Sequence, residues 1–98
     1  MTDTAAIVGA IRADYAANAT HDGQWMPLSW IREGEHTSRF LRADVDEALR
    51  VLARGDSPHR DIVLEEQANQ KTLTCADRGA AIHVGGCDLT EIRIGDGW

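Results

Sequence analysis

The sequence predicts a single α+β domain, and three observations on its 98 residues support this. Apolar residues recur at helical spacing through the N-terminal half, which predicts three helices. From Ile62 onward the spacing changes to the pattern that is typical of strands. The hydrophobic content of 43% and the charged content of 27% are close to the averages of soluble domains. A chain of this length therefore builds one small core.

The first helix is expected over residues 3–19. One side of this segment carries Ile7, Val8, Ile11 and Tyr15, and the other side is rich in alanine, which favours helix without requiring burial. The N-cap is expected at residue 2 or 3, a threonine and an aspartate that both suit this position.

The second helix is expected over residues 27–33, after a turn at Asp22-Gly23 and a short extended stretch at Trp25-Met26. Pro27 suits the first helical turn because its missing N–H would be unpaired there. Gly34 is expected to end the helix as a C-cap. A tight connection then leads to a third helix, and this order of elements is that of a helix-turn-helix unit.

The third helix is expected over residues 38–54 and is amphipathic. Its apolar stripe consists of Leu41, Val45, Ala48, Leu49 and Leu52, whereas Arg39, Ala43, Arg50 and Arg54 lie on the opposite side. Ser38 is the expected N-cap. The alternative is a later start at Asp44, because Asp44-x-x-Glu47 has the form of a capping box.

The C-terminal part is expected to form two strands with a short helix between them. Residues 62–64 are apolar and continue into two glutamates, and residues 89–94 alternate with Thr90, Ile92 and Ile94 on one face. Thr74 and Asp77 have the spacing of a capping box for a helix that extends to about residue 82. The glycine-containing segment 84–88 then turns the chain back.

This order of elements resembles a winged-helix (winged helix-turn-helix) domain, in which a β-hairpin after the third helix forms the wing. The resemblance covers about residues 7–94 and implies three helices plus a small antiparallel hairpin, with residues 62–94 as an elaborated wing. Residues 64–88 also resemble a block in small, uncharacterised winged-helix-like proteins of actinobacteria. This second resemblance implies no particular activity. The usual wing is a bare hairpin, whereas this one holds residues 69–87 with a helix inside. That departure argues against a simple minor-groove role.

The resemblance implies a DNA-binding protein, either a small transcriptional regulator or a plasmid or phage accessory factor, with double-stranded DNA as its partner. The third helix would then be the recognition helix in the major groove, where arginine suits guanine edges and phosphates. The candidate DNA contacts are Thr37, Ser38, Arg39, Arg42, Ala43, Arg50, Arg54 and Lys71. Phe40 and Val51 lie off the apolar stripe and are candidates for a contact in a homodimer or with a partner.

The charged candidates also have a purely structural interpretation. Asp46 and Glu47 precede Arg50 at the spacing of helical surface ion pairs, which are worth only a few tenths of a kcal/mol. Lys71 belongs to the polar stretch Asn69-Gln70-Lys71, whose composition is that of an ordinary turn.

The net charge of −6 opposes indiscriminate phosphate binding. Residues 1–37 carry a net charge of −3, residues 38–60 carry +1, and residues 61–98 carry −4. Only the third helix and the turn after it are therefore not acidic. The alternative function is an acidic protein-protein interaction module on the same scaffold, without nucleic-acid binding.

Neither catalysis nor cofactor binding is expected, because the sequence has no nucleophile elbow, phosphate loop or dinucleotide fingerprint. Cys75, His83 and Cys87 lack the close ligand pair of structural zinc sites, so no metal is expected. The two cysteines are expected to be free thiols of a cytoplasmic protein. No apolar run approaches the roughly 18 residues that a membrane span requires, and no membrane contact is expected.

Overall fold

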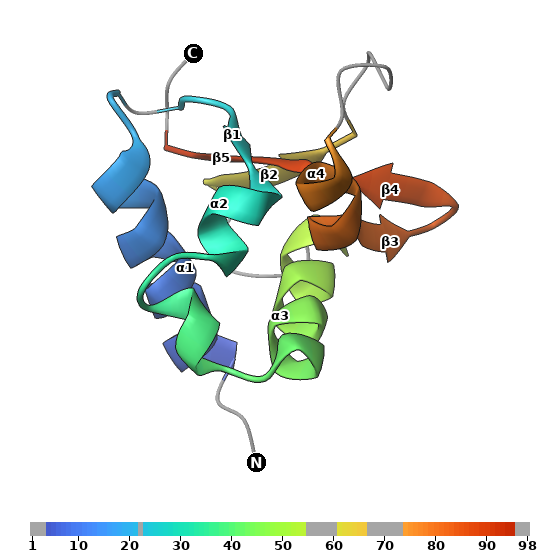
Figure 1. Ribbon diagram of the computed structural model, residues 1–98, viewed down its shortest axis with the longest axis horizontal. Coiled ribbons are helices and arrows are strands. Elements are labelled where there is room, and N and C mark those ends of the chain that lie inside the picture. The colour runs from blue at the N-terminus through green and yellow to red at the C-terminus, as the bar shows by residue number, and fades with distance from the viewer. Residues whose placement is uncertain (1–3, 22, 55–60, 67–73, 96–98) are drawn as a thin grey trace.

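The computed structural model describes residues 4–21, 23–54, 61–66 and 74–95, and these residues form an α+β fold, as the sequence predicts. Figure 1 shows a small antiparallel sheet along one side of the helices. The elements in chain order are α1 (Thr4–Asn18), β1 (Met26–Pro27), α2 (Leu28–Arg32), the 3-10 helix η1 (Thr37–Arg39), α3 (Arg42–Arg54), β2 (Ile62–Glu65), α4 (Cys75–Ala80), β3 (Ile82–Val84), β4 (Cys87–Leu89) and β5 (Glu91–Ile94).

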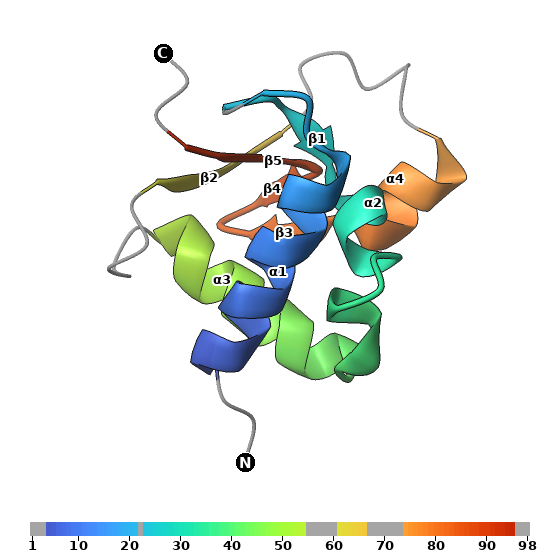
Figure 2. The ribbon, with the colours of Figure 1, turned by 90° about the vertical axis from the view of Figure 1, so that its left-hand side faces the viewer.

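The core lies between α1, α2, α3 and the inner face of the sheet. Figure 2 shows α1 in front of α3, with the sheet above both helices. The predicted apolar side of α1 is confirmed, because Ile7, Val8, Ile11 and Tyr15 are all buried. The predicted N-cap at residue 2 or 3 lies outside the described residues.

The sheet has the strand order β1-β5-β2, so the last strand lies between the first two. Met26 and Leu64 both face Ile92 across the antiparallel ladder, and the side chains of all three are buried. The predicted strand 89–94 is interrupted at Thr90, which lies between β4 and β5. The Thr90 N–H donates to the Glu65 carbonyl (3.0 Å), and the Thr90 carbonyl accepts from the Leu28 N–H (2.9 Å). The common face predicted for the last strand is confirmed, because Thr90, Ile92 and Ile94 are all buried.

α2 is shorter than the predicted range 27–33, because Pro27 is paired in β1 and the helix begins at Leu28. Leu28 and Ile31 are fully buried. The chain leaves the helix through Glu33, whose N–H still bonds the Ser29 carbonyl at 3.1 Å.

The predicted start of the third helix at Ser38 is wrong, and so is the alternative at Asp44. The backbone of Phe40 is extended (φ −96°, ψ 155°) and separates η1 from α3. The Leu41 carbonyl accepts the first intrahelical bonds, from the N–H groups of Asp44 (3.0 Å) and Val45 (3.1 Å). Leu41 thus precedes the helix and is 74% exposed, whereas the rest of the predicted apolar stripe, Val45, Ala48, Leu49 and Leu52, is buried.

The chain between β2 and β5 carries α4 and the β3–β4 hairpin. The predicted capping box is confirmed: Thr74 Oγ1 accepts from the Asp77 N–H, and an Asp77 carboxylate oxygen accepts from the Thr74 N–H, each at 3.1 Å. α4 ends at Ala80 rather than near residue 82, because Ile82 is already paired in β3. Gly85 and Gly86 have positive φ angles of 58° and 85°, as a two-residue hairpin turn requires.

Candidate nucleic-acid interface

The turn that leads into α3 is held by Asp14, a residue of α1 that is only 2% exposed. Its carboxylate accepts hydrogen bonds from the backbone N–H groups of Thr37 (2.7 Å) and His36 (3.1 Å). Gly34 lies against the same carboxylate, and a Cβ at that position would come within 2.2 Å of Asp14 Cγ. The geometry of the turn between α2 and α3 therefore depends on a buried acid and on a glycine that makes room for it.

The environment of Asp14 favours its ionised form. Burial raises the pKa, but the hydrogen bonds from Thr37 and His36 outweigh it, and the pKa of Asp14 lies below its ordinary value. A carboxylate that accepts backbone N–H groups is a strong anchor, because charge-assisted hydrogen bonds are shorter and stronger than neutral ones.

The structure places the sequence-predicted DNA contacts in three different settings. Thr37 is 1% exposed and belongs to the anchored turn rather than to the surface. Lys71 lies outside the described residues. The other six reach the surface to different degrees: Ser38, Arg39, Arg42, Ala43 and Arg54 are exposed, and Arg50 is half-buried.

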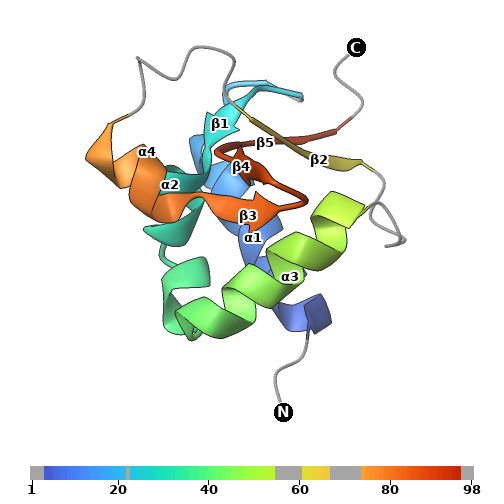
Figure 3. The same ribbon diagram turned by 90° about the vertical axis from the view of Figure 1, so that its right-hand side faces the viewer.

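Four of the surface residues of α3 share one side of the helix, which we call the α3 face: Ala43, Glu47, Arg50 and Arg54. Their spacing of three or four residues places them in one row along the helix. Figure 3 looks onto α3 and shows the β3–β4 hairpin beside it.

The arginines of this region have carboxylates nearby. Arg50 Nη1 lies 3.7 Å from Glu47 Oε2, one of the pairs that the sequence predicts, and Arg39 Nη2 lies 3.5 Å from Glu35 Oε1. The Arg39 and Glu35 side chains are 67% and 79% exposed. Such exposed pairs are worth at most about 1 kcal/mol, so a phosphate or a base edge can displace the carboxylate.

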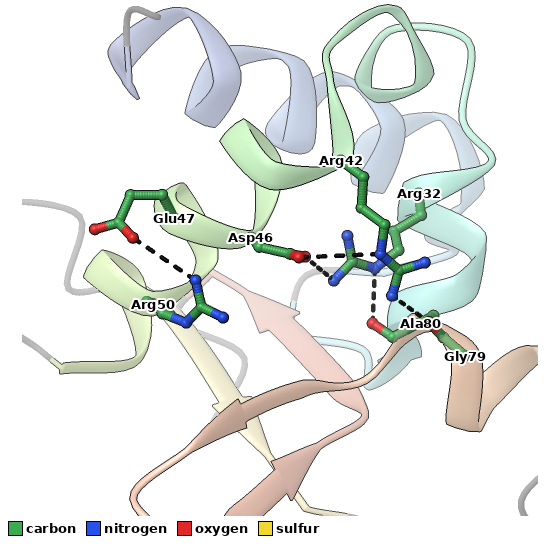
Figure 4. Close-up of polar contacts among 7 residues, drawn as sticks. All are labelled: Arg32, Arg42, Asp46, Glu47, Arg50, Gly79 and Ala80. Atoms are coloured by element: carbon green, nitrogen blue, oxygen red, sulfur yellow. Dashed lines mark hydrogen bonds and ion pairs between the residues drawn. The ribbon is translucent and has the colours of Figure 1, made fainter.

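Arg42 has a structural role instead. Figure 4 shows Arg32 and Arg42 reaching the C-terminal end of α4, where Arg42 donates to the Gly79 carbonyl and Arg32 Nε donates to the Ala80 carbonyl (2.7 Å). Helix C-termini leave carbonyls without intrahelical partners, and these two side chains supply the missing donors. Arg42 is therefore occupied in joining α3 to α4.

Asp46 completes this link. Its carboxylate oxygens lie 2.6 Å from Arg32 Nη2 and 3.9 Å from Arg42 Nε. The sequence predicts that Asp46 pairs with Arg50, and the structure pairs it with these two arginines instead. Arg32 was not among the sequence-derived candidates. Its contacts join residues 14 and 48 positions apart in the chain, and no local pattern contains them.

Electrostatically the region is balanced rather than basic. α3 carries three arginines (Arg42, Arg50 and Arg54) and three acids (Asp44, Asp46 and Glu47), so its formal net charge is zero. On the hairpin, His83 Nδ1 lies 2.7 Å from the carboxylate of Asp88, and both side chains are exposed. The α3 face therefore carries individual charged groups rather than a strong overall field.

The described residues show no alternative chemical centre. Cys75 and Cys87 are exposed free cysteines, and the nearby Glu66 carboxylate raises the pKa of the Cys87 thiol, which lowers its nucleophilic fraction. Among the described histidines, cysteines and acids, no group of three is placed to hold a metal ion.

No protein-family model, curated protein or solved structure matches the chain. None of the helices in the described part of the chain is long and apolar enough to cross a membrane.

Proposed function

We propose that this protein is a winged-helix DNA-binding protein that places α3 in the major groove of duplex DNA, as a small transcriptional regulator or a plasmid or phage accessory factor does. The order α1, β1, α2, α3 followed by the β2/β5 pair supports the winged-helix relationship. In this arrangement the β3–β4 hairpin is the part of the wing that lies beside the recognition helix.

One observation carries the proposal: α3 buries its apolar stripe and leaves Ala43, Arg50 and Arg54 in one row on the surface. Ala43 lies in the first turn of the helix and lets the backbone approach a groove closely. Arg50 and Arg54 follow at seven and eleven residues, within reach of base edges or phosphates along the same groove. Arg42 and Thr37, by contrast, are assigned to holding the fold.

The proposal is tested by selecting duplexes from a random library at low salt and measuring their affinity by fluorescence anisotropy. Arg50→Ala is expected to weaken binding by about 1–3 kcal/mol if it contacts a base, and Arg54→Ala to weaken it as well. The matched control is Arg93→Ala, which removes the same charge from the outer face of the sheet, where Arg93 lies 5.1 Å from the ring centre of Trp25. Equal losses in all three variants, or no selectable duplex, would contradict the proposal.

A second candidate function is an acidic protein-protein interaction module on the same scaffold. The observation that favours it is Trp30, which is 48% exposed on α2, away from the α3 face. Exposed tryptophan is a frequent anchor of protein interfaces. A partner that is recovered from nuclease-treated lysate by the wild type and lost with Trp30→Ser would support this function, provided that the duplex selection fails.

A further inference from the structure

A groove of about 320 Å³ lies between α1 and the turn that carries η1. Its walls are formed by small residues of α1 on one side and by the η1 turn on the other: Ala6, Gly9, Ala10, Ala13, His36, Arg39 and Phe40. The groove is far larger than the roughly 30 Å³ that one water molecule occupies.

Leu41 is 74% exposed, which is the largest exposure among the big apolar side chains that the structure describes. It follows Phe40, which lines the groove. The chain therefore carries an exposed apolar side chain one residue after the last lining residue of the groove. A two-fold axis between two copies of the chain would bring Leu41 of each copy to the groove of the other.

The charges around the two features are complementary. The groove is bordered by Arg39 and His36, whereas Leu41 is followed three residues later by Asp44. Within the described part of the chain, no cation lies within ion-pairing distance of Asp44. Among the described residues, Arg39 pairs with the exposed carboxylate of Glu35 at 3.5 Å, which a second acid can replace.

Gly9 supports a close approach at this place. A Cβ on Gly9 would have nothing within 4 Å, so packing inside the chain does not require glycine there. A glycine inside a helix lowers helix stability relative to alanine, and its presence on an open surface lets another backbone or side chain come close.

We propose that the α1/η1 groove is the interface of a homodimer, in which Leu41 of each copy fills the groove of the other and Asp44 pairs with Arg39 across the two-fold axis. This inference does not depend on DNA binding. The α3 face, defined above by Ala43, Glu47, Arg50 and Arg54, is not used by it.

Sedimentation equilibrium of the full chain without DNA tests the proposal, over protein concentrations from about 1 μM to 1 mM. The wild type is expected to form a dimer in this range. Leu41→Glu is expected to raise the dimer dissociation constant by at least about tenfold, because it puts a charge where the leucine would be buried in the dimer. Trp30→Glu is the matched control, since it changes an exposed apolar residue outside the groove, and its constant is expected to stay at the wild-type value.

A charge exchange provides a second readout. Arg39→Glu alone and Asp44→Arg alone are each expected to weaken the dimer, and the double variant is expected to recover it, because the pair is re-formed with opposite signs. A wild type that stays monomeric, an equal effect of Leu41→Glu and Trp30→Glu, or a double variant weaker than both single variants would overturn the proposal.

Discussion

Asp14 holds the turn between α2 and α3. It is buried on α1, it accepts two backbone N–H groups of the η1 turn, and Gly34 leaves room for its carboxylate. Removing the acceptor leaves buried N–H groups unpaired, which costs about 1–3 kcal/mol for each group. The link between α1 and the turn that leads into α3 therefore depends on the protonation state of Asp14.

The first prediction concerns the pH dependence of stability. Because the pKa of Asp14 is lower in the folded protein than its ordinary value of about 3.9, its ionised form stabilises the fold above about pH 4. This contribution is lost as the pH falls through the folded-state pKa. Asp14→Asn is therefore expected to lower the free energy of unfolding by about 1–3 kcal/mol at neutral pH.

Urea denaturation at pH 7 and at about pH 3 checks this prediction. The difference between the wild type and Asp14→Asn is expected to shrink at the lower pH, since wild-type Asp14 is then losing its charge. A difference of the same size at both pH values would show that the charge of Asp14 contributes nothing and that only its shape matters.

At the scale of elements, the two arginines at the end of α4 connect three helices. Arg32 belongs to α2, Arg42 to α3, and both bond carbonyls of α4, while Asp46 lies between them. Ser29 of α2 adds a hydrogen bond to Asp77 of α4 at 3.2 Å. α4 is thus fixed to both α2 and α3.

The second prediction is that Arg32→Met destabilises the fold by about 1–3 kcal/mol, because the Ala80 carbonyl and Asp46 lose a donor in a mostly buried place. The Arg32 side chain is only 11% exposed. Arg50→Met is the control and is expected to change the unfolding free energy by less than about 0.5 kcal/mol, since the pair of Arg50 with Glu47 is solvent-accessible. Urea denaturation measures the free energy of unfolding of both variants, and equal losses in the two would refute the structural role of Arg32.

Elements with a local signal were predictable from the sequence. The capping box of α4, the alternation of β5 and the glycine turn of the β3–β4 hairpin are all encoded within a few residues. The start of α3 was not predictable, because Leu41 fits the helical spacing although the extended backbone of Phe40 lies before it.

The anchors of the candidate site were hidden for a related reason. Asp14 contacts Thr37 across 23 positions of the chain, and Arg32 contacts Ala80 across 48. Neither contact leaves a pattern within one helix, so the sequence placed Thr37 and Arg42 on a DNA surface although both serve the fold. The residues of the α3 face, by contrast, follow from helical spacing alone.

At the scale of the whole molecule, the net charge of −6 and the neutral α3 limit how DNA can be bound. Phosphate neutralisation supplies nearly all non-specific affinity, and few cations are available here. If the protein binds DNA as proposed, binding depends on sequence contacts, and the specific affinity is expected to exceed the non-specific affinity by a wide margin.

The third prediction is a shallow salt dependence. If Arg50 and Arg54 supply the phosphate contacts, the slope of log affinity against log salt is about −2 for a monomer and about −4 for a dimer. Anisotropy titrations with a selected duplex between low and moderate salt measure this slope. A slope steeper than about −6 would show that cations outside the α3 face carry the binding.

The most direct test of the DNA-binding account is amide chemical-shift mapping by NMR while a selected duplex is added to the full chain. The account predicts the largest changes on α3 between Ala43 and Arg54 and on the β3–β4 hairpin, with smaller changes on the outer face of the sheet around Arg93. Changes confined to the sheet or to α2, or none at saturating DNA, would contradict it.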